Sequence, residues 1–276
     1  MTALDASRPF AAARVVVTGA GGIFGRRIAA AFARAGARLC LSDPRPDVLE
    51  RLPAELGLPR DSALRHATEL RENSSILELV RLVAGAWGAP DVLINNAGVY
   101  PRGHLLDVPV EEWDRIMDVN LRAPFILTRE MARLMIAAGV EGSVVNITSG
   151  AAQRVRTGSV PYSTSKAALE RLTAGLALEL APHRIRVNAV SPGFAPGSIV
   201  SPLSPAYVEA MLARIPLGRA SGPDDAPNAI LFLCSPQASF ITGATLAVDG
   251  GNALGTVDPP TVDESGGGSA APSPIR

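Results

Sequence analysis

Short apolar runs alternate with longer stretches of helical periodicity along most of this chain. Runs that are nearly all apolar are typical of strands buried on both faces of a sheet. They occupy residues 13–17, 37–42, 63–67 (a weaker run), 91–95, 142–148, 185–190 and 244–248. Helical patterns lie between them, at 23–36, 74–88, 110–138, 160–181, 204–214 and 224–234. The alternation predicts an α/β fold of the Rossmann type, a doubly wound and mainly parallel seven-stranded sheet with helices on both faces.

Two features modify this pattern. Pro124 lies inside the longest helical stretch and predicts a kink there, because proline cannot donate the helical hydrogen bond. From residue 252 the chain becomes rich in Gly, Ser and Pro and loses its periodicity. We therefore expect one folded domain over residues 1–251 and a flexible tail over 252–276.

Composition excludes several classes of protein. The 26 basic and 26 acidic residues cancel, which argues against a broad basic surface for nucleic acid. Cys40 and Cys234 are far apart in the sequence, so neither a disulfide framework nor a metal site is expected. No apolar run approaches the roughly 18 residues of a membrane span, and the N-terminus lacks the apolar core of a signal peptide. We expect a soluble, cytoplasmic protein that binds neither membrane nor nucleic acid.

The first predicted strand leads into a glycine-rich turn and then a helix. Gly19, Gly22 and Gly25 have the spacing G-x-x-G-x-x-G, which lets a pyrophosphate approach a helix N-terminus. Asp43 ends the second strand about 20 residues further on, where a carboxylate accepts from ribose hydroxyls and repels a 2′-phosphate. This predicts NAD, although Arg45 can offset part of the repulsion and leaves NADP possible. The structural alternative is a tight turn without a ligand, with Asp43 merely starting the next turn.

Tyr162 and Lys166 are four residues apart on one predicted helix. Their side chains can therefore meet, and an ammonium beside a phenol lowers a pKa that is ordinarily about 10. Such a tyrosine can act as an acid or a base near neutral pH. Lys166 is also the only lysine of the chain, in a protein whose other basic residues are all arginine. Taken alone, the pair could equally be a half-buried tyrosine and a solvated lysine.

Further motifs occur in a fixed order around this pair. They are TGAGGIFG from Thr18, NNAG at 95–98, Asn120 in DVNL, Ser149 in NITS, YSTSK at 162–166, SPG at 191–193 and VDGG at 248–251. In order and spacing, the chain resembles the short-chain dehydrogenase/reductase family over about residues 11–251. The resemblance implies that 1–251 is a dinucleotide-binding and catalytic domain.

The resemblance also implies a role for each matching residue. Tyr162 would be the general acid/base, and Lys166 would lower its pKa and hold the nicotinamide ribose. Ser149 would bind the reacting oxygen, and Asn120 would hold a water linked to Lys166. Cofactor contacts are expected from Gly19, Gly22, Ile23, Gly25, Asp43, Glu69, Leu70, Asn96, Ala97, Gly98, Tyr162, Lys166, Pro192 and Gly193.

The chain departs from the family pattern at three places in the cofactor site, one of which is Glu69, where the family commonly has an Asp that meets the adenine. The usual turn is T-G-x-x-x-G-x-G, whereas Ile23 follows the middle glycine, Gly22, in this chain. Gly197 stands where the family often has threonine, so Ser198 is a possible substitute.

Substrate contacts are less defined by the sequence. Gln153, Arg154 and Arg156 precede the Tyr162 helix, and Arg102 follows the NNAG segment. These arginines could bind a carboxylate or phosphate. The competing interpretation, favoured by the arginine-rich composition, is that they are solvated surface residues.

We therefore predict an NAD(H)-dependent oxidoreductase that interconverts a secondary alcohol and a ketone. The alternatives are an NADPH-dependent ketoreductase of acyl or polyketide-type carbonyls and a non-catalytic nucleotide-binding module. Small residues on the Tyr162 helix allow close helix packing and suggest a homodimer or homotetramer: Ala167, Ala168, Ala174, Gly175 and Ala177.

Overall fold

A single parallel sheet organises the structure. The computed structural model describes residues 10–59, 62–197 and 204–255, and within them seven strands pair in the order β3-β2-β1-β4-β5-β6-β7. Every neighbouring pair of strands is parallel. The strands are Arg14–Thr18 (β1), Arg38–Asp43 (β2), Leu64–Ala67 (β3), Val92–Asn95 (β4), Ser143–Ile147 (β5), Arg186–Pro192 (β6) and Thr245–Val248 (β7). All seven predicted strands are confirmed, with ends that differ by one or two residues. The expected tail lies outside the described residues from 256 onward.

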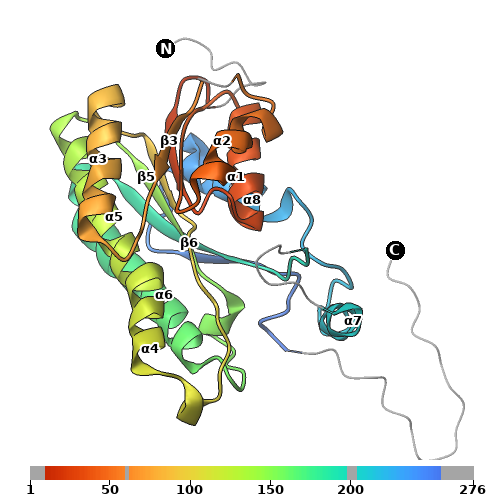
Figure 1. Cartoon of the computed structure of the whole chain (residues 1–276). Coiled ribbons are helices and arrows are strands. Elements are labelled where there is room, and N and C mark those ends of the chain that lie inside the picture. The colour runs from red at the N-terminus through yellow and green to blue at the C-terminus, as the bar shows by residue number, and fades with distance from the viewer. Residues whose placement is uncertain (1–9, 60–61, 198–203, 256–276) are drawn as a thin grey trace, which may run out of the picture.

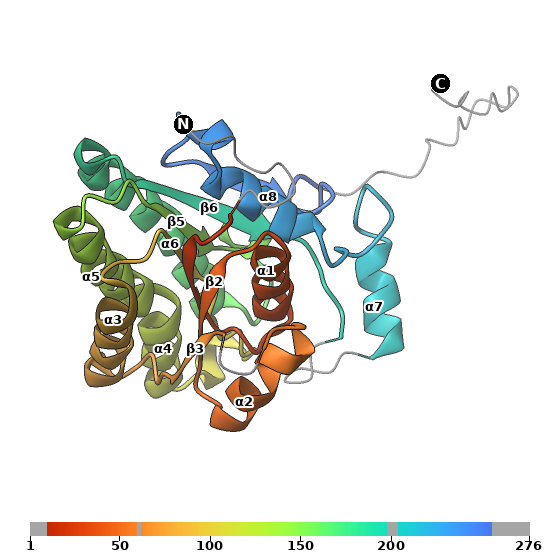
Figure 2. The same ribbon diagram turned by 90° about the horizontal axis from the view of Figure 1, so that it is seen from above.

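Helices cover both faces of the sheet (Figures 1 and 2). One face carries α1 (Ile23–Arg34), α2 (Pro46–Glu55) and α8 (Asp225–Cys234), whose apolar residues share one buried cluster with β1 and β2. A second buried cluster joins the other face to α3 (Asn73–Trp87), α5 (Ala123–Ala137) and α6 (Val160–Leu180). The two remaining α-helices of the described residues are α4 (Val110–Met117) and α7 (Pro205–Leu212). Short 3-10 turns occupy Leu105–Asp107, Gly150–Ala152, Ala181–His183 and Pro236–Ala238.

The helix α2 is absent from the sequence interpretation, which is wrong on this point. The helix has only ten residues, begins at Pro46 and contains Pro53, so its short pattern is easily taken for a loop. Proline is well tolerated at the first helical position because its missing N–H has no helical partner there. Val48, Leu49 and Leu52 provide the buried face, at the spacing that a helix requires.

The long helical stretch at 110–138 is divided into three parts. The helix α4 ends at Met117, a π-helical turn spans Asp118–Arg122, and α5 begins at Ala123. Pro124 explains the interruption, because it has no N–H to donate to the carbonyl of Asn120 four residues earlier. Where the sequence predicts a kink at Pro124, the structure has this π-helical interruption, which contains the fully buried Asn120.

The strand order reverses between β1 and β4, and the loops that follow these two strands meet. Gly19 has a φ of +61°, and a Cβ at this position would lie 2.7 Å from the Cα of Ala97. Only glycine fits both the left-handed backbone and this close approach. In open parallel sheets, ligands bind at the carboxyl ends of the strands where the order reverses. The topology therefore directs attention to the loops around Gly19 and Ala97.

Neither a membrane span nor a metal centre is found in the described part of the chain. No helix there is both long and apolar enough to cross a bilayer. The same residues contain no group of three or more His, Cys, Asp and Glu side chains placed to hold a metal ion.

Candidate active site

Side-chain hydrogen bonds connect the two loops at the reversal point. The amide of Asn96 donates to the carbonyls of Thr18, at 2.8 Å, and Gly19, at 3.0 Å. The hydroxyl of Thr18 accepts from the backbone N–H groups of Asn96 and Ala97, both at 3.1 Å. The Asn96 side chain therefore holds the glycine turn in place, whereas sequence reasoning placed it along the cofactor itself.

The glycine turn has the shape that a phosphate group needs. Gly22 precedes α1 without a side-chain cap, and no acidic residue occupies the first turn of that helix. A Cβ on Gly25 would collide with the Gly19 carbonyl and the Ala20 backbone. The first turn of α1 therefore lies close against the loop, with its backbone N–H groups unblocked by a side chain. These features fit the pyrophosphate of a dinucleotide. Ile23 begins the helix and is partly buried.

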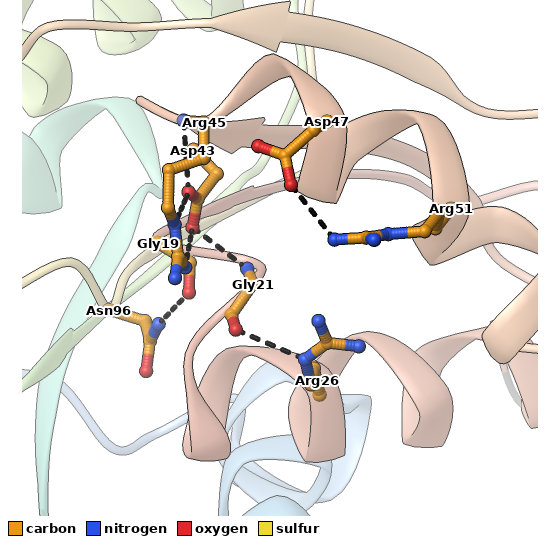
Figure 3. A network of polar contacts seen from close by, with 8 residues as sticks. All are labelled: Gly19, Gly21, Arg26, Asp43, Arg45, Asp47, Arg51 and Asn96. Carbon is orange, nitrogen blue, oxygen red and sulfur yellow. Dashed lines mark hydrogen bonds and ion pairs between the residues drawn. The ribbon is translucent and has the colours of Figure 1, made fainter. Parts of the chain in front are cut away.

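Asp43 is held by a dense set of donors (Figure 3). Its carboxylate accepts from the backbone N–H of Gly21 at 3.0 Å and from the Arg45 guanidinium at 2.8 and 3.2 Å. The backbone N–H of Arg45 adds a contact at 3.2 Å. The carboxyl side chain is only 2% exposed, and its hydrogen bonds raise the pKa of Arg45. The acidic group expected at the adenosine ribose thus carries its own counter-ion.

The other predicted cofactor residues divide into two groups. Glu69 is engaged by Arg71, which donates to both carboxylate oxygens at 3.0 and 3.1 Å, and Leu70 is buried in the core. These contacts do not place Glu69 on an adenine. Gly193, by contrast, is packed tightly against the end of β7: its N–H donates to the Val248 carbonyl at 2.8 Å, and a Cβ there would come 2.8 Å from the Cα of Asp249.

Three predicted reactive residues come together at the carboxyl edge of the sheet. Ser149 follows β5, while Tyr162 and Lys166 lie in the first two turns of α6. The Lys166 ammonium lies 6.0 Å from the centre of the Tyr162 ring. It donates to the carbonyl of Ile147 at 2.8 Å. The hydroxyl of Ser149 accepts from the Ala151 N–H at 3.2 Å, which fixes its orientation and leaves its proton available.

The protonation equilibria of this cluster follow from burial. Burial raises the pKa of Tyr162, and a hydrogen bond with Ser149 lowers it in part. The pKa of Tyr162 is raised overall, so the depression expected from Lys166 does not prevail over burial. Burial also lowers the pKa of Lys166 from 10.5 to about 8, because its side chain is only 4% exposed and has no acidic partner among the described residues.

Asn120 supports this cluster through its side-chain amide. Its oxygen accepts from the Val99 N–H at 2.8 Å, and its nitrogen donates to the Val99 carbonyl at 2.9 Å and the Ser165 hydroxyl at 3.0 Å. The side chain therefore ties the loop after β4 to α6. The main-chain carbonyl of Asn120 cannot accept from residue 124, because proline has no N–H. A Cβ on Gly98 would lie 3.4 Å from both Asn120 and Lys166.

Two residues near this cluster were not singled out by sequence reasoning. The Tyr100 ring meets the Tyr162 ring edge-on, with centroids 6.3 Å apart. Glu170 lies one helical turn after Lys166 and bonds Thr148, next to Ser149, while burial raises its pKa. One of its oxygens, Oε1, is buried with no hydrogen-bond partner in the described structure. The four-residue spacing from Lys166 is the signal that could have identified Glu170.

The predicted substrate residues are placed unevenly. Gln153 is exposed, and Arg154 donates to the Asn252 carbonyl at 3.4 Å. Arg156 and Arg102 both reach α7, where they contact Met211 and Tyr207. Ser198, the suggested substitute for a family threonine, lies outside the described residues.

Comparisons with known proteins agree with this geometry. Residues 19–253 match a family profile described as enoyl-(acyl carrier protein) reductase. The chain is 39% identical to human L-xylulose reductase over 243 residues, covering 86% of this chain and 95% of that protein. Among solved structures, it is similar to a short-chain type dehydrogenase/reductase from Mycobacterium marinum, with 32% identity, a TM-score of 0.82 and coverage of 89% of this chain and 97% of that chain. It is also similar to 3-ketoacyl-(acyl-carrier-protein) reductase from Brucella melitensis in complex with NADH, with 35% identity, a TM-score of 0.79 and coverage of 88% and 99%.

The burial of Lys166 makes a prediction about stability. The unfolded chain holds this proton up to a pKa near 10.5, but the folded chain only to about 8, so protonation of Lys166 disfavours folding. The penalty is complete below pH 8, shrinks between 8 and 10.5, and vanishes above that range. Relative to a Lys166→Met variant without nucleotide, wild-type protein should gain about 2 kcal/mol of unfolding free energy between about pH 7 and about pH 9.5. Urea unfolding at both pH values measures the difference, and an equal difference at the two would contradict the burial argument.

Proposed function

Since this chain belongs to the short-chain dehydrogenase/reductase family, we propose that it interconverts a secondary alcohol and a ketone with NAD(H), using Tyr162 as the general acid/base. The chain is an oxidoreductase with a nicotinamide cofactor, as its relatives indicate. The observation that carries the proposed mechanism is the convergence of Ser149, Tyr162 and Lys166 beside the glycine turn. When bound, the nicotinamide supplies or accepts the hydride.

The residues of this chain account for the proton and the reacting oxygen. Ser149 is oriented by the Ala151 N–H and can donate its proton to a substrate oxygen. Tyr162 donates its proton to that oxygen during reduction and accepts a proton from the alcohol during oxidation. Lys166 is anchored on the Ile147 carbonyl, so its remaining protons can bind a ribose hydroxyl or a water. Asn120 keeps the loop after β4 against this helix.

A passive nucleotide-binding module has less need of this arrangement. Burying an ammonium without an acidic partner costs stability, as the lowered pKa of Lys166 indicates. A protein that only binds a nucleotide could hold the ribose through a lysine, but it would not need Ser149 and Tyr162 beside that lysine. The buried lysine beside Tyr162 therefore supports catalysis over simple binding.

Removing the Tyr162 hydroxyl tests the proposal directly. In a Tyr162→Phe variant, we expect hydride transfer to fall by roughly 10²–10⁴-fold, because the general acid/base is lost while the binding surface for the nucleotide remains. The rate is followed by nicotinamide absorbance with a panel of secondary alcohols and ketones, and NADH affinity by fluorescence. Turnover that survives in the variant would rule out the assigned role of Tyr162.

The choice of cofactor depends on the pair formed by Asp43 and Arg45. Asp43 favours the free ribose hydroxyls of NAD, and the solved relative from Brucella melitensis contains NADH. Arg45 neutralises part of the Asp43 charge and is itself 40% exposed, so it can turn toward a 2′-phosphate. The second candidate function, an NADPH-dependent ketoreductase of acyl-type carbonyls, draws its support from Arg45. We propose NAD(H) as the preferred cofactor, with Arg45 moderating the preference.

Substitution of Arg45 separates the two cofactors. An Arg45→Ala variant leaves Asp43 without its counter-ion, so we expect the ratio of the NADPH and NADH dissociation constants to rise about tenfold, or about 1.4 kcal/mol. Arg51→Ala is the matched control, because Arg51 pairs with Asp47 on the exposed side of α2 and does not touch Asp43 (Figure 3). A ratio that is unchanged in Arg45→Ala, or that changes equally in both variants, would refute the role of Arg45.

We also propose that the protein self-associates through α6 and α5, in a reducing compartment such as the cytoplasm. Ala167 and Gly175 are exposed on α6, Leu178 is 78% exposed, and Phe125 on α5 is 40% exposed. Such an apolar surface with small residues suits a close helix contact between copies. Light scattering should give a mass of two or four times 28.6 kDa, and a monomer at micromolar concentration would contradict it.

The free thiols Cys40 and Cys234 support the proposal of a reducing compartment, which cell fractionation checks.

A further inference from the structure

Two loops flank the reactive tyrosine, and each carries an arginine. The loop after β4 contains Tyr100, which meets the Tyr162 ring edge-on, and two residues later Arg102. The loop before α6 contains Arg156, six residues before Tyr162. A backbone hydrogen bond of 3.1 Å from the Gly103 N–H to the Gly158 carbonyl joins the two loops. The two arginines therefore belong to one connected frame beside Tyr162.

Both guanidinium groups reach the same side of α7. Arg102 donates to the Tyr207 hydroxyl at 2.6 Å and lies 5.2 Å from the centre of that ring. Arg156 donates to the sulfur of Met211 at 3.3 Å. Tyr207 and Met211 are four residues apart, so their side chains share one face of the helix. The Tyr207 ring also lies 6.5 Å from the ring of Phe194, which directly follows Pro192 and Gly193.

The acceptors that these arginines use are weak ones. A thioether is a poor hydrogen-bond acceptor, and a phenol carries no charge at neutral pH. Within the described residues, neither Arg102 nor Arg156 forms an ion pair. Elsewhere on the described surface arginine commonly does so, as in the bidentate pair of Arg115 with Glu112 at 2.7 Å.

The acidic residue that follows β7, Asp249, is engaged by backbone N–H groups. Asp249 accepts from the backbone N–H groups of Gly251, at 2.9 Å, and Ala253, at 2.7 Å. Its oxygens therefore stabilise the turn after β7. The whole chain has a formal net charge of zero, so the guanidinium groups of Arg102 and Arg156, which reach α7 without an ion pair among the described residues, are a local feature and not part of a general excess.

We propose that Arg102 and Arg156 form a subsite for an anionic group of the substrate, either a carboxylate or a phosphate monoester. The substrate would then be a keto acid and its hydroxy acid, or a phosphorylated ketone and its alcohol. Guanidinium binds both anions through two parallel N–H donors, which is a stronger interaction than its contacts with Tyr207 or Met211. Arg154, bound to the Asn252 carbonyl, adds positive charge at the same loop. This subsite rests on the proposed alcohol–ketone reaction at Tyr162. By binding the anionic group, it would orient the substrate so that the reacting oxygen faces Tyr162.

Matched pairs of ketones test the subsite. Acetoacetate, 4-oxopentanoate and 5-oxohexanoate place the carboxylate at increasing distances from the carbonyl, and their methyl esters lack the charge. Hydroxyacetone phosphate and hydroxyacetone form the phosphate pair. Initial rates with NADH give kcat and KM for wild type, Arg102→Gln, Arg156→Gln and the double variant. The control is Arg81→Gln, because Arg81 is an exposed residue of α3 that lies 3.9 Å from Glu78.

We expect the wild type to prefer at least one anion over its neutral partner by tenfold or more in kcat/KM. The double variant should lose that preference mainly through a higher KM, with the neutral ketone changed less than twofold and Arg81→Gln unchanged. A larger preference in the phosphate pair would identify a phosphate ester, and a larger one in the acid pairs a carboxylate. Equal kcat/KM for charged and neutral partners, or a preference that survives in the double variant, would overturn the subsite.

A binding measurement separates failure of the subsite from failure of the reaction. The thermal midpoint of the NADH-loaded protein is recorded with 4-oxopentanoate and with its methyl ester, and likewise with the phosphate pair, for the wild type and the double variant. If only the anionic member of a pair stabilises the protein and the double variant loses this effect, the subsite is supported even where no ketone is reduced. The absence of reduction would then count against the proposed reaction only. No difference between acid and ester, together with none between hydroxyacetone phosphate and hydroxyacetone, would overturn the subsite while leaving the test of Tyr162 intact.

Discussion

The connection between the loops after β1 and β4 is the constraint on which the site depends. Thr18 and Asn96 exchange hydrogen bonds across the point where the strand order reverses, and Gly19 lies too close to Ala97 for any larger residue. The same loop is held on its other side by Asn120, through Val99. The glycine turn and the reactive helix are thereby fixed relative to one rigid segment. This segment thus helps to position both the phosphate turn, through Asn96, and α6, through Asn120 and Ser165.

The sequence predicts the arrangement of strands and helices well, because burial determines where apolar residues occur. The five inner strands are buried and mostly apolar, so they are visible as apolar runs, whereas the edge strands β3 and β7 are partly exposed. The helix α2 escapes prediction because it is short and contains Pro53, although Val48 and Leu52 are correctly spaced. The π turn is foreseen only as a break at Pro124. Its exact extent depends on how Asn120 is buried, which no local pattern records.

The sequence predicts which residues make up the site, but not which other side chains they bind. Motif spacing brings Ser149, Tyr162 and Lys166 together, as the structure has them. The sequence suggests that Arg45 can offset the charge of Asp43, but it does not reveal their direct hydrogen bonds or the pairing of Arg71 with Glu69, because these contacts depend on side-chain conformation. The pKa of Tyr162 shows the same limit. Two residues at helical spacing suggest a charge effect, but desolvation of both groups depends on the whole surrounding structure and dominates here.

The arginine-rich composition gives the protein an unusual response to alkali. Arginine does not lose its proton in proteins, so the positive charge of the surface stays constant as the pH rises. The two thiols are held at a pKa of about 12 by burial and remain neutral. Lys166, the only lysine, titrates near pH 8. In mild alkali, Lys166 is therefore the one side-chain cation of this molecule that loses its proton. The active site can lose its positive charge while the arginine charges on the surface stay the same.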